Sequence, residues 1–85
     1  MSVKERLLDA GYEDAPHFIN PDYEDALIGT TDDGRAVFNY DKMIECLMDE
    51  ENWSYDEALD WVEYNVIRSV PYMGKRAPII VHPID

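Results

Sequence analysis

The stretch SYDEALDWVEYNVIRSVP at residues 54–71 decides the fold, because it predicts one amphipathic helix with a defined start and stop. Ser54 and Glu57 have the spacing of a capping box, in which two side chains satisfy backbone N–H groups at the start of a helix. Pro71 cannot donate a backbone hydrogen bond, and it ends the helix. The apolar residues between them recur at the spacing of one helical face and predict a single buried stripe. That stripe consists of Ala58, Leu59, Val62, Val66 and Ile67.

A second helix is predicted directly before this one, over residues 40–51, with Asn39 as its cap and Asn52 at its end. Its apolar side chains follow the same helical spacing. They are Tyr40, Met43, Ile44, Leu47 and Met48. Because few residues separate the two helices, we expect them to pack side by side as a helical hairpin.

Two β-rich runs precede the helices, ALIGTT at residues 26–31 and RAVFNY at residues 35–40. The Asp33-Gly34 pair between them predicts a β-hairpin closed by a type I′ turn, which needs positive φ at both central residues. A last strand is predicted within APIIVHP at residues 77–83. Its unbroken apolar run predicts burial on both faces or under a helix.

The start of the chain predicts a short helix followed by an irregular connector. Ser2 and Glu5 have the spacing of another capping box, and Gly11 provides a left-handed helix end. Residues 15–23 hold two prolines and are expected to be irregular, with a brief edge strand as an option at residues 18–19.

The predicted order of elements is α-β-β-α-α-β, which is typical of an α+β fold. We expect a small sheet made of the β-hairpin and the C-terminal strand. The helical hairpin is expected to cover one face of it, and the short N-terminal helix completes the fold. Residues 1–85 are expected to form a single domain, because a chain of 85 residues cannot bury two cores.

The charge of the chain is strongly negative and unevenly distributed. Its net charge is −12, and residues 9–63 hold 17 acids against two bases. Such a surface repels phosphate groups, so we expect neither direct nucleic-acid binding nor binding to membranes. No run approaches the roughly 20 apolar residues of a membrane span, and a cytoplasmic location is expected. Cys46 is the one cysteine, which excludes an internal disulfide and a cysteine-rich zinc site.

Six acidic residues recur at helical spacing on the two predicted helices, and we call them the acidic ridge. They are Asp41, Glu45, Asp49, Asp56, Asp60 and Glu63. One interpretation is a solvated face that keeps a small protein soluble. Another is an imitation of a phosphate backbone that binds a basic, nucleic-acid-binding protein. Divalent-cation binding is a third, although Asp32-Asp33-Gly34 lacks the alternating oxygen ligands of a calcium loop.

The end of the opening stretch allows a structural and a functional interpretation. In the structural one, the Asn65 amide bonds to the backbone of residues 71–76, Pro71 stops the helix and Gly74 lets the chain reverse. In the functional one, exposed side chains form an interaction surface that we call the aromatic-basic patch. The patch consists of Tyr64, Arg68, Tyr72, Met73 and Lys75. A homodimer built on this patch is an alternative function.

Residues with catalytic or metal-binding chemistry are sparse. His17 and His82 lie 65 residues apart, without a metal-ligand spacing. Ser54 and Ser69 lack a G-x-S-x-G context, and the acidic surroundings of Cys46 disfavour a thiolate. We therefore expect no enzyme, no metal and no cofactor. The alternative is a metal-dependent or acid–base enzyme that uses carboxylates near one of the histidines.

Two segments carry a family resemblance. The first is DALIGTTDDGRAVFNYDKMIECL, and the second contains EYNVIRSVPYMGKRAPI, which has the pattern EYN-x-IR-x-x-PYMG-x-x-API. Together they resemble a group of small acidic proteins from bacteria and their mobile elements, and the similarity extends over residues 20–81. The resemblance implies a compact fold and adds no activity. We therefore expect a cytoplasmic, non-enzymatic interaction module with a protein partner.

Overall fold

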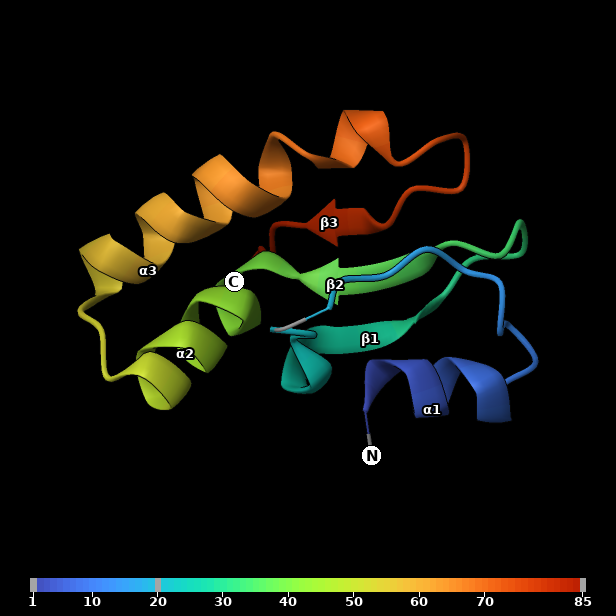
Figure 1. Ribbon diagram of the computed structural model, residues 1–85, viewed down its shortest axis with the longest axis horizontal. Coiled ribbons are helices and arrows are strands. Elements are labelled where there is room, and N and C mark those ends of the chain that lie inside the picture. Colours follow the sequence, from blue (N-terminus) through green and yellow to red (C-terminus); the bar gives the residue numbers. More distant parts are fainter. Residues whose placement is uncertain (1, 20, 85) are drawn as a thin grey trace.

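The computed structural model describes residues 2–19 and 21–84, and it confirms an α+β fold with a three-stranded sheet (Figure 1). The main helices and strands are α1 (Val3–Asp9), β1 (Leu27–Thr30), β2 (Ala36–Asn39), α2 (Tyr40–Glu51), α3 (Tyr55–Trp61) and β3 (Ile79–Val81). The short helical segments are the 3₁₀ turn η1 (Glu24–Ala26), the π-helical η2 (Val62–Ile67) that continues α3, and the 3₁₀ turn η3 (Val70–Tyr72).

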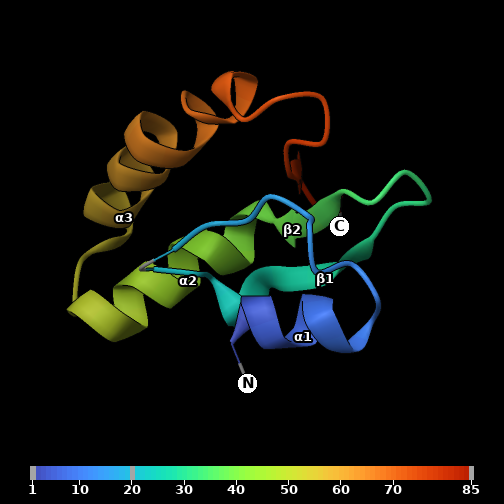
Figure 2. The ribbon, with the colours of Figure 1, turned by 45° about the vertical axis from the view of Figure 1, so that its right-hand side comes forward.

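Strand β2 lies at the centre of the sheet. It pairs antiparallel with β1 and parallel with β3, so the order across the sheet is β1-β2-β3. A parallel pair needs a crossover connection, and the helical hairpin of α2 and α3 supplies it between β2 and β3. The two helices pack against each other, whereas α1 lies beside β1 (Figures 1 and 2).

The turn of the β1–β2 hairpin differs from the predicted type I′ turn. The backbone N–H of Thr31 donates to the carbonyl of Arg35 at 2.9 Å, and that of Gly34 donates to Thr31 at 3.0 Å. Within this turn, which the structure describes completely, Gly34 takes positive φ (+82°) and Asp33 does not. The type I′ prediction is therefore wrong, and the turn is a three-residue loop with glycine at its left-handed position.

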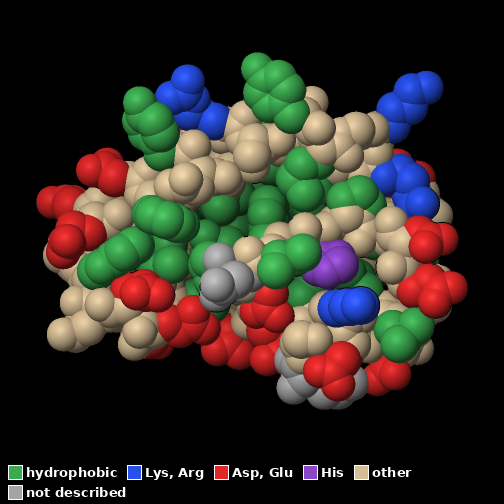
Figure 3. Space-filling model, in the orientation of Figure 1, with side chains coloured by type: hydrophobic (Ala, Val, Ile, Leu, Met, Phe, Trp, Pro, Cys, Tyr) green, Lys and Arg blue, Asp and Glu red, His purple; other side chains and the backbone are tan. Residues whose placement is uncertain are grey.

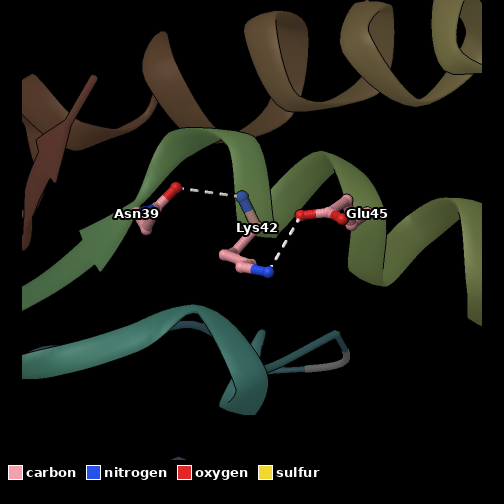
Figure 4. A network of polar contacts seen from close by, with 3 residues as sticks. All are labelled: Asn39, Lys42 and Glu45. Carbon is pink, nitrogen blue, oxygen red and sulfur yellow. Dashed lines mark hydrogen bonds and ion pairs between the residues drawn. The ribbon is translucent and has the colours of Figure 1, made fainter. Parts of the chain in front are cut away.

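The helix boundaries follow the predicted caps. Both capping boxes form, and the side chain of Asn39 accepts a hydrogen bond from the backbone N–H of Lys42 at 3.0 Å (Figure 4). Gly11 and Asn52, at φ +86° and +58°, take the left-handed conformation that commonly ends a helix. Local satisfaction of backbone groups therefore fixes the ends of α1 and α2.

The core lies where the sheet, α1, the helical hairpin and the N-terminal connector meet. Its largest fully buried side chains include Phe38, Leu7, Met43, Ile44, Leu47, Val3 and Val62. The ring centroid of Phe38 lies 5.2 Å from that of Phe18, which in turn lies 5.8 Å from the Tyr23 ring in an edge-on arrangement. Aromatic contacts thus fasten the connector to the sheet.

The edge strand suggested at Phe18 and Ile19 is wrong. Phe18 packs against Phe38, whereas Ile19 is 84% exposed, and neither residue joins the strand ladder. Pro16 and Pro21 flank this segment and cannot donate ladder hydrogen bonds. The segment therefore packs on the sheet through one side chain instead of extending it.

Strand β3 is less buried than its apolar sequence predicted. Ile79, Ile80 and Val81 are all half-buried, because β3 is an edge strand with β2 as its one neighbour in the sheet. The expected burial on both faces is therefore wrong.

The stripe of the opening stretch is buried as predicted, but it is narrow. Ala58, Val62 and Val66 are at most 3% exposed, and Leu59 and Ile67 are half-buried. Every other residue of α3 and η2 is exposed. A narrow line of apolar contact therefore holds this helix, with Leu59 and Ile67 packed beside it, and most of its remaining circumference faces solvent.

The capping box at the start of α3 gives a stability prediction. Replacing Ser54 with Ala leaves the N–H of Glu57 without its 3.3 Å hydrogen bond. We expect a loss of about 1 kcal/mol in the free energy of unfolding, measured by urea denaturation. Ser54→Asp, which keeps a capping oxygen, is the control and should stay close to wild type. Equal stability of Ser54→Ala and wild type would contradict the role of this cap.

Candidate functional site

The acidic ridge lies on the solvent side of the helical hairpin. All six of its residues are exposed, as predicted from their spacing. In Figure 3, acidic side chains gather along the left and lower margins of the molecule, over α3 and α2. Within the described part of the chain the ridge forms one ion pair, in which Lys42 Nζ lies 3.4 Å from Glu45 Oε2 (Figure 4). Both side chains of this pair are 57% exposed, so water screens it and most of the ridge charge stays uncompensated.

Glu63 differs from the other five members of the ridge. Its carboxylate accepts a hydrogen bond from the hydroxyl of Tyr40 at the start of α2. Burial, and then the bond to Glu63, raises the pKa of Tyr40 well above its ordinary value. The ring centroid of Tyr40 also lies 4.3 Å from the ring centroid of His82, which follows β3. Glu63 therefore ties η2 to α2 and contributes less than the others to a free acidic surface.

The two histidines lie in different surroundings. His17 lines a hollow of about 490 Å³, and its Nδ1 lies 3.0 Å from the carbonyl oxygen of Ala15. Asp22 lines the same hollow, but its two carboxylate oxygens accept backbone N–H groups of Val3 and Glu24. Asp22 therefore has a structural role in joining the N-terminal helix to the connector. Within residues 2–19 and 21–84, no group of three or more His, Cys, Asp or Glu residues is arranged to hold a metal ion.

The Cys46 thiol is buried in α2. Burial raises its pKa to about 11, and the negative charge of Asp25 adds to the rise. The thiol therefore stays protonated near neutral pH, which suits a core side chain better than a nucleophile.

The predicted structural anchor is only partly correct. Gly74 has φ +93°, which lets the chain reverse, and Pro71 lies in η3 after the helical stretch has ended. Asn65, however, is exposed, and its Nδ2 donates to the carbonyl of Trp61 at 3.1 Å. Because Asn65 lies off the buried stripe, its amide bonds to its own helix and the expected bond to residues 71–76 is wrong.

The aromatic-basic patch is exposed at its two tyrosines. Tyr64 is 71% exposed and Tyr72 is 89% exposed, and the guanidinium carbon of Arg68 lies 4.7 Å from the centre of the Tyr64 ring. Lys75 is also exposed, whereas Met73 is half-buried. The expected self-association through this patch stays a prediction.

An aromatic groove on α3 was not foreseen from the sequence. It has a volume of about 420 Å³, and the residues that line it are Trp53, Glu57, Asp60, Trp61, Tyr64 and Asn65. The centroids of the two tryptophan rings lie 5.5 Å apart. A signal was present in the sequence, because Glu57, Trp61 and Tyr64 lie at i, i+4 and i+7 on the face that the apolar stripe leaves free.

Comparisons with protein-family models, with curated proteins and with solved structures give no significant match to this chain. The resemblance to small acidic proteins of bacteria and mobile elements therefore stays a prediction. None of the helices in the described ranges combines the length and apolar character that crossing a membrane needs. The candidate function consequently rests on the surfaces described above.

Tyr23 lines a small hollow together with Trp61 and Asn65, and two of its features are unfavourable. Its φ is +56°, and its hydroxyl, on a side chain that is 2% exposed, has no hydrogen bond of ordinary geometry among the described residues. Burial raises its pKa to about 12, and the Trp61 side chain close to the hydroxyl opposes part of this rise. A buried hydroxyl without a good partner costs stability, which the packing of the ring against Phe18 offsets.

Replacing Tyr23 with Phe removes the hydroxyl and keeps the ring. We expect the free energy of unfolding at neutral pH to rise by about 1 kcal/mol in a urea titration. In the folded protein the pKa of Tyr23 is about 12, whereas the ordinary value is 10.0. The unfolded chain therefore loses the hydroxyl proton at lower pH than the folded protein does. The stability of the wild type consequently falls as pH rises from about 10 to about 12. The variant should show a smaller fall. A variant less stable than wild type would contradict this expectation, because it would show that the hydroxyl forms a stabilising hydrogen bond.

Proposed function

We propose that this protein is a non-enzymatic interaction module that binds a basic protein through the acidic ridge. The observation that carries the proposal is the exposure of a row of carboxylates on each of two adjacent helices. The five members without a bond to Tyr40 are Asp41, Glu45, Asp49, Asp56 and Asp60. Lys42 offsets one of these five charges, and its exposed pair with Glu45 contributes at most about 1 kcal/mol to stability.

Repulsion along the ridge supplies part of the driving force for binding. Carboxylates four residues apart on a helix are roughly 6 Å apart at their stems, and each such pair costs a few tenths of a kcal/mol. Lysine and arginine side chains of a partner relieve this repulsion. They also accelerate the encounter, because opposite net charges steer the two surfaces together.

A nucleic-acid-binding protein is the class of partner that fits this pattern. Such proteins carry clustered basic side chains that meet regularly spaced phosphates. Rows of carboxylates offer the same sign of charge at regular spacing, so the module would compete with nucleic acid for the basic surface. The proposal places this encounter in the cytoplasm, a reducing compartment that suits a chain with one buried free thiol.

The test compares two variants that lose the same number of acids. In the ridge variant, Asp41, Asp49, Asp56 and Asp60 become Asn and Glu45 becomes Gln. The probe is a purified basic DNA-binding protein, and calorimetry at low and high salt gives the Kd. We expect the ridge variant to bind about tenfold or more weakly than wild type at low salt, since several charge pairs are lost. Wild-type affinity should fall as salt rises.

The matched control neutralises five exposed acids away from the helical hairpin. In it, Asp9, Asp14, Asp32 and Asp33 become Asn and Glu13 becomes Gln. This variant has the same net charge as the ridge variant, so it should keep most of the wild-type affinity. Equal losses in the two variants, or an affinity that salt does not change, would show that the ridge is not the binding surface.

A further inference from the structure

The aromatic groove shares Asp60 with the acidic ridge and Trp53 with the edge of the core, but Trp61 and Tyr64 belong to neither. Two tryptophans and a tyrosine line it together with the carboxylate residues Glu57 and Asp60, and none of its lining residues is basic. Trp61 is 39% exposed and Tyr64 is 71% exposed, so large aromatic surfaces face solvent beside negative charge. Exposed aromatic side chains grouped in a hollow are typical of a binding surface.

The groove is held in shape by contacts on both sides. The Trp53 and Trp61 rings pack at 5.5 Å with an angle of 53° between their planes. Glu57 accepts the backbone N–H of Ser54 at 3.1 Å, which keeps its carboxylate at the start of α3. A ligand would therefore meet a largely prearranged site, which lowers the entropic cost of binding.

The chemistry of the groove favours a planar cation. Aromatic faces attract cations through their quadrupole, and nearby carboxylates add Coulombic attraction. Arginine suits such a site better than lysine, because its guanidinium stacks on rings and is weakly hydrated. The guanidinium carbon of Arg68 already lies 4.7 Å from the centroid of the Tyr64 ring, so that face of Tyr64 is occupied and a ligand would stack on Trp61.

A second hollow extends the groove toward the N-terminal connector. It has a volume of about 130 Å³ and shares Trp61 and Asn65 with the groove. Its other walls include Phe18 and Ile19, and Ile19 is 84% exposed. This neighbouring apolar wall suits an aliphatic side chain next to the cation. Figure 3 shows hydrophobic side chains between the acidic areas of the left half of the molecule.

We propose that the aromatic groove binds an arginine side chain of the basic partner, with an adjacent aliphatic side chain of the same segment in the second hollow. This inference rests on the proposed function and names the point of closest contact. The ridge attracts a basic protein by charge at longer range, whereas the groove selects an arginine with an adjacent aliphatic residue.

The first test uses a short probe and the fluorescence of the protein itself. Both tryptophans of the chain line the groove, so their emission reports its occupancy. The probe is the acetylated and amidated peptide Ser-Gly-Arg-Ile-Gly-Ser, and its control replaces arginine with citrulline, which has nearly the same shape and no charge. We expect a saturable change in emission with the arginine peptide and little or none with the citrulline peptide. Equal responses to the two peptides would overturn the proposal.

The second test locates the contact with Trp61→Leu and a matched exposed aromatic, Tyr55→Leu. Tyr55 is 52% exposed and does not line the groove. We expect Trp61→Leu to bind the arginine peptide about tenfold more weakly and Tyr55→Leu to bind it as wild type does. Circular dichroism confirms folding. Glu57→Gln keeps the capping geometry, removes the charge and should weaken binding severalfold, so the groove stays testable if Trp61→Leu unfolds.

The basic DNA-binding protein separates failure of this inference from failure of the proposed function. If Trp61→Leu and Glu57→Gln bind that protein as wild type does while the ridge variant does not, the groove is not the contact and the ridge still is. If the ridge variant and its charge-matched control lose affinity equally, the proposed function itself fails. Loss in the groove variants and the ridge variant, with both controls intact, supports the two together.

Discussion

The burial of one narrow apolar stripe on α3 and η2 is the contact on which the rest of the surface depends. Ala58, Val62 and Val66 are almost fully buried, and a buried valine contributes roughly 1.5–3 kcal/mol relative to an exposed one. Because these few contacts hold the helix in place, its remaining circumference is free to carry residues that a core would exclude. The carboxylates of α3 and all groove residues except Trp53, which precedes the helix, occupy that free circumference. The residues that we propose for binding therefore lie on a different face of this helix from the residues that hold it against the core.

The N-terminal connector completes this arrangement from the other side. Phe18 packs on Phe38 of β2 and on Tyr23, so an irregular segment is fastened to the sheet without joining it. The same segment presents Ile19 to solvent and walls the hollow that it shares with Trp61.

The acidic surface costs stability through repulsion, but exposure to water and salt keeps that cost small. A partner with basic side chains would turn the same charge into affinity and selectivity.

Local features of the sequence predicted the local structure, and non-local contacts account for what it did not predict. Ser54 and Asn39 cap their helices, and the periodicity of the apolar residues identified the buried stripe, because each depends on residues a few positions apart. The parallel pairing of β3 with β2 depends on how the helical hairpin folds back, which no local pattern contains. The same holds for the bond between Tyr40 and Glu63 and for the ring contact between Trp53 and Trp61. The aromatic groove could be predicted in part, from the helical spacing of Glu57, Trp61 and Tyr64 along α3 and η2.

Quenching of tryptophan fluorescence is the sharpest test of this arrangement, in which the narrow stripe leaves Trp61 exposed beside carboxylates and the half-buried Trp53 packs against it. Acrylamide, which is neutral, reports access, while caesium and iodide report the sign of the local potential. We expect acrylamide to quench the emission and caesium to quench it more strongly than iodide, with a smaller difference in Glu57→Gln. Emission protected from acrylamide, or quenched by iodide as strongly as by caesium, would rule out an exposed Trp61 beside carboxylates.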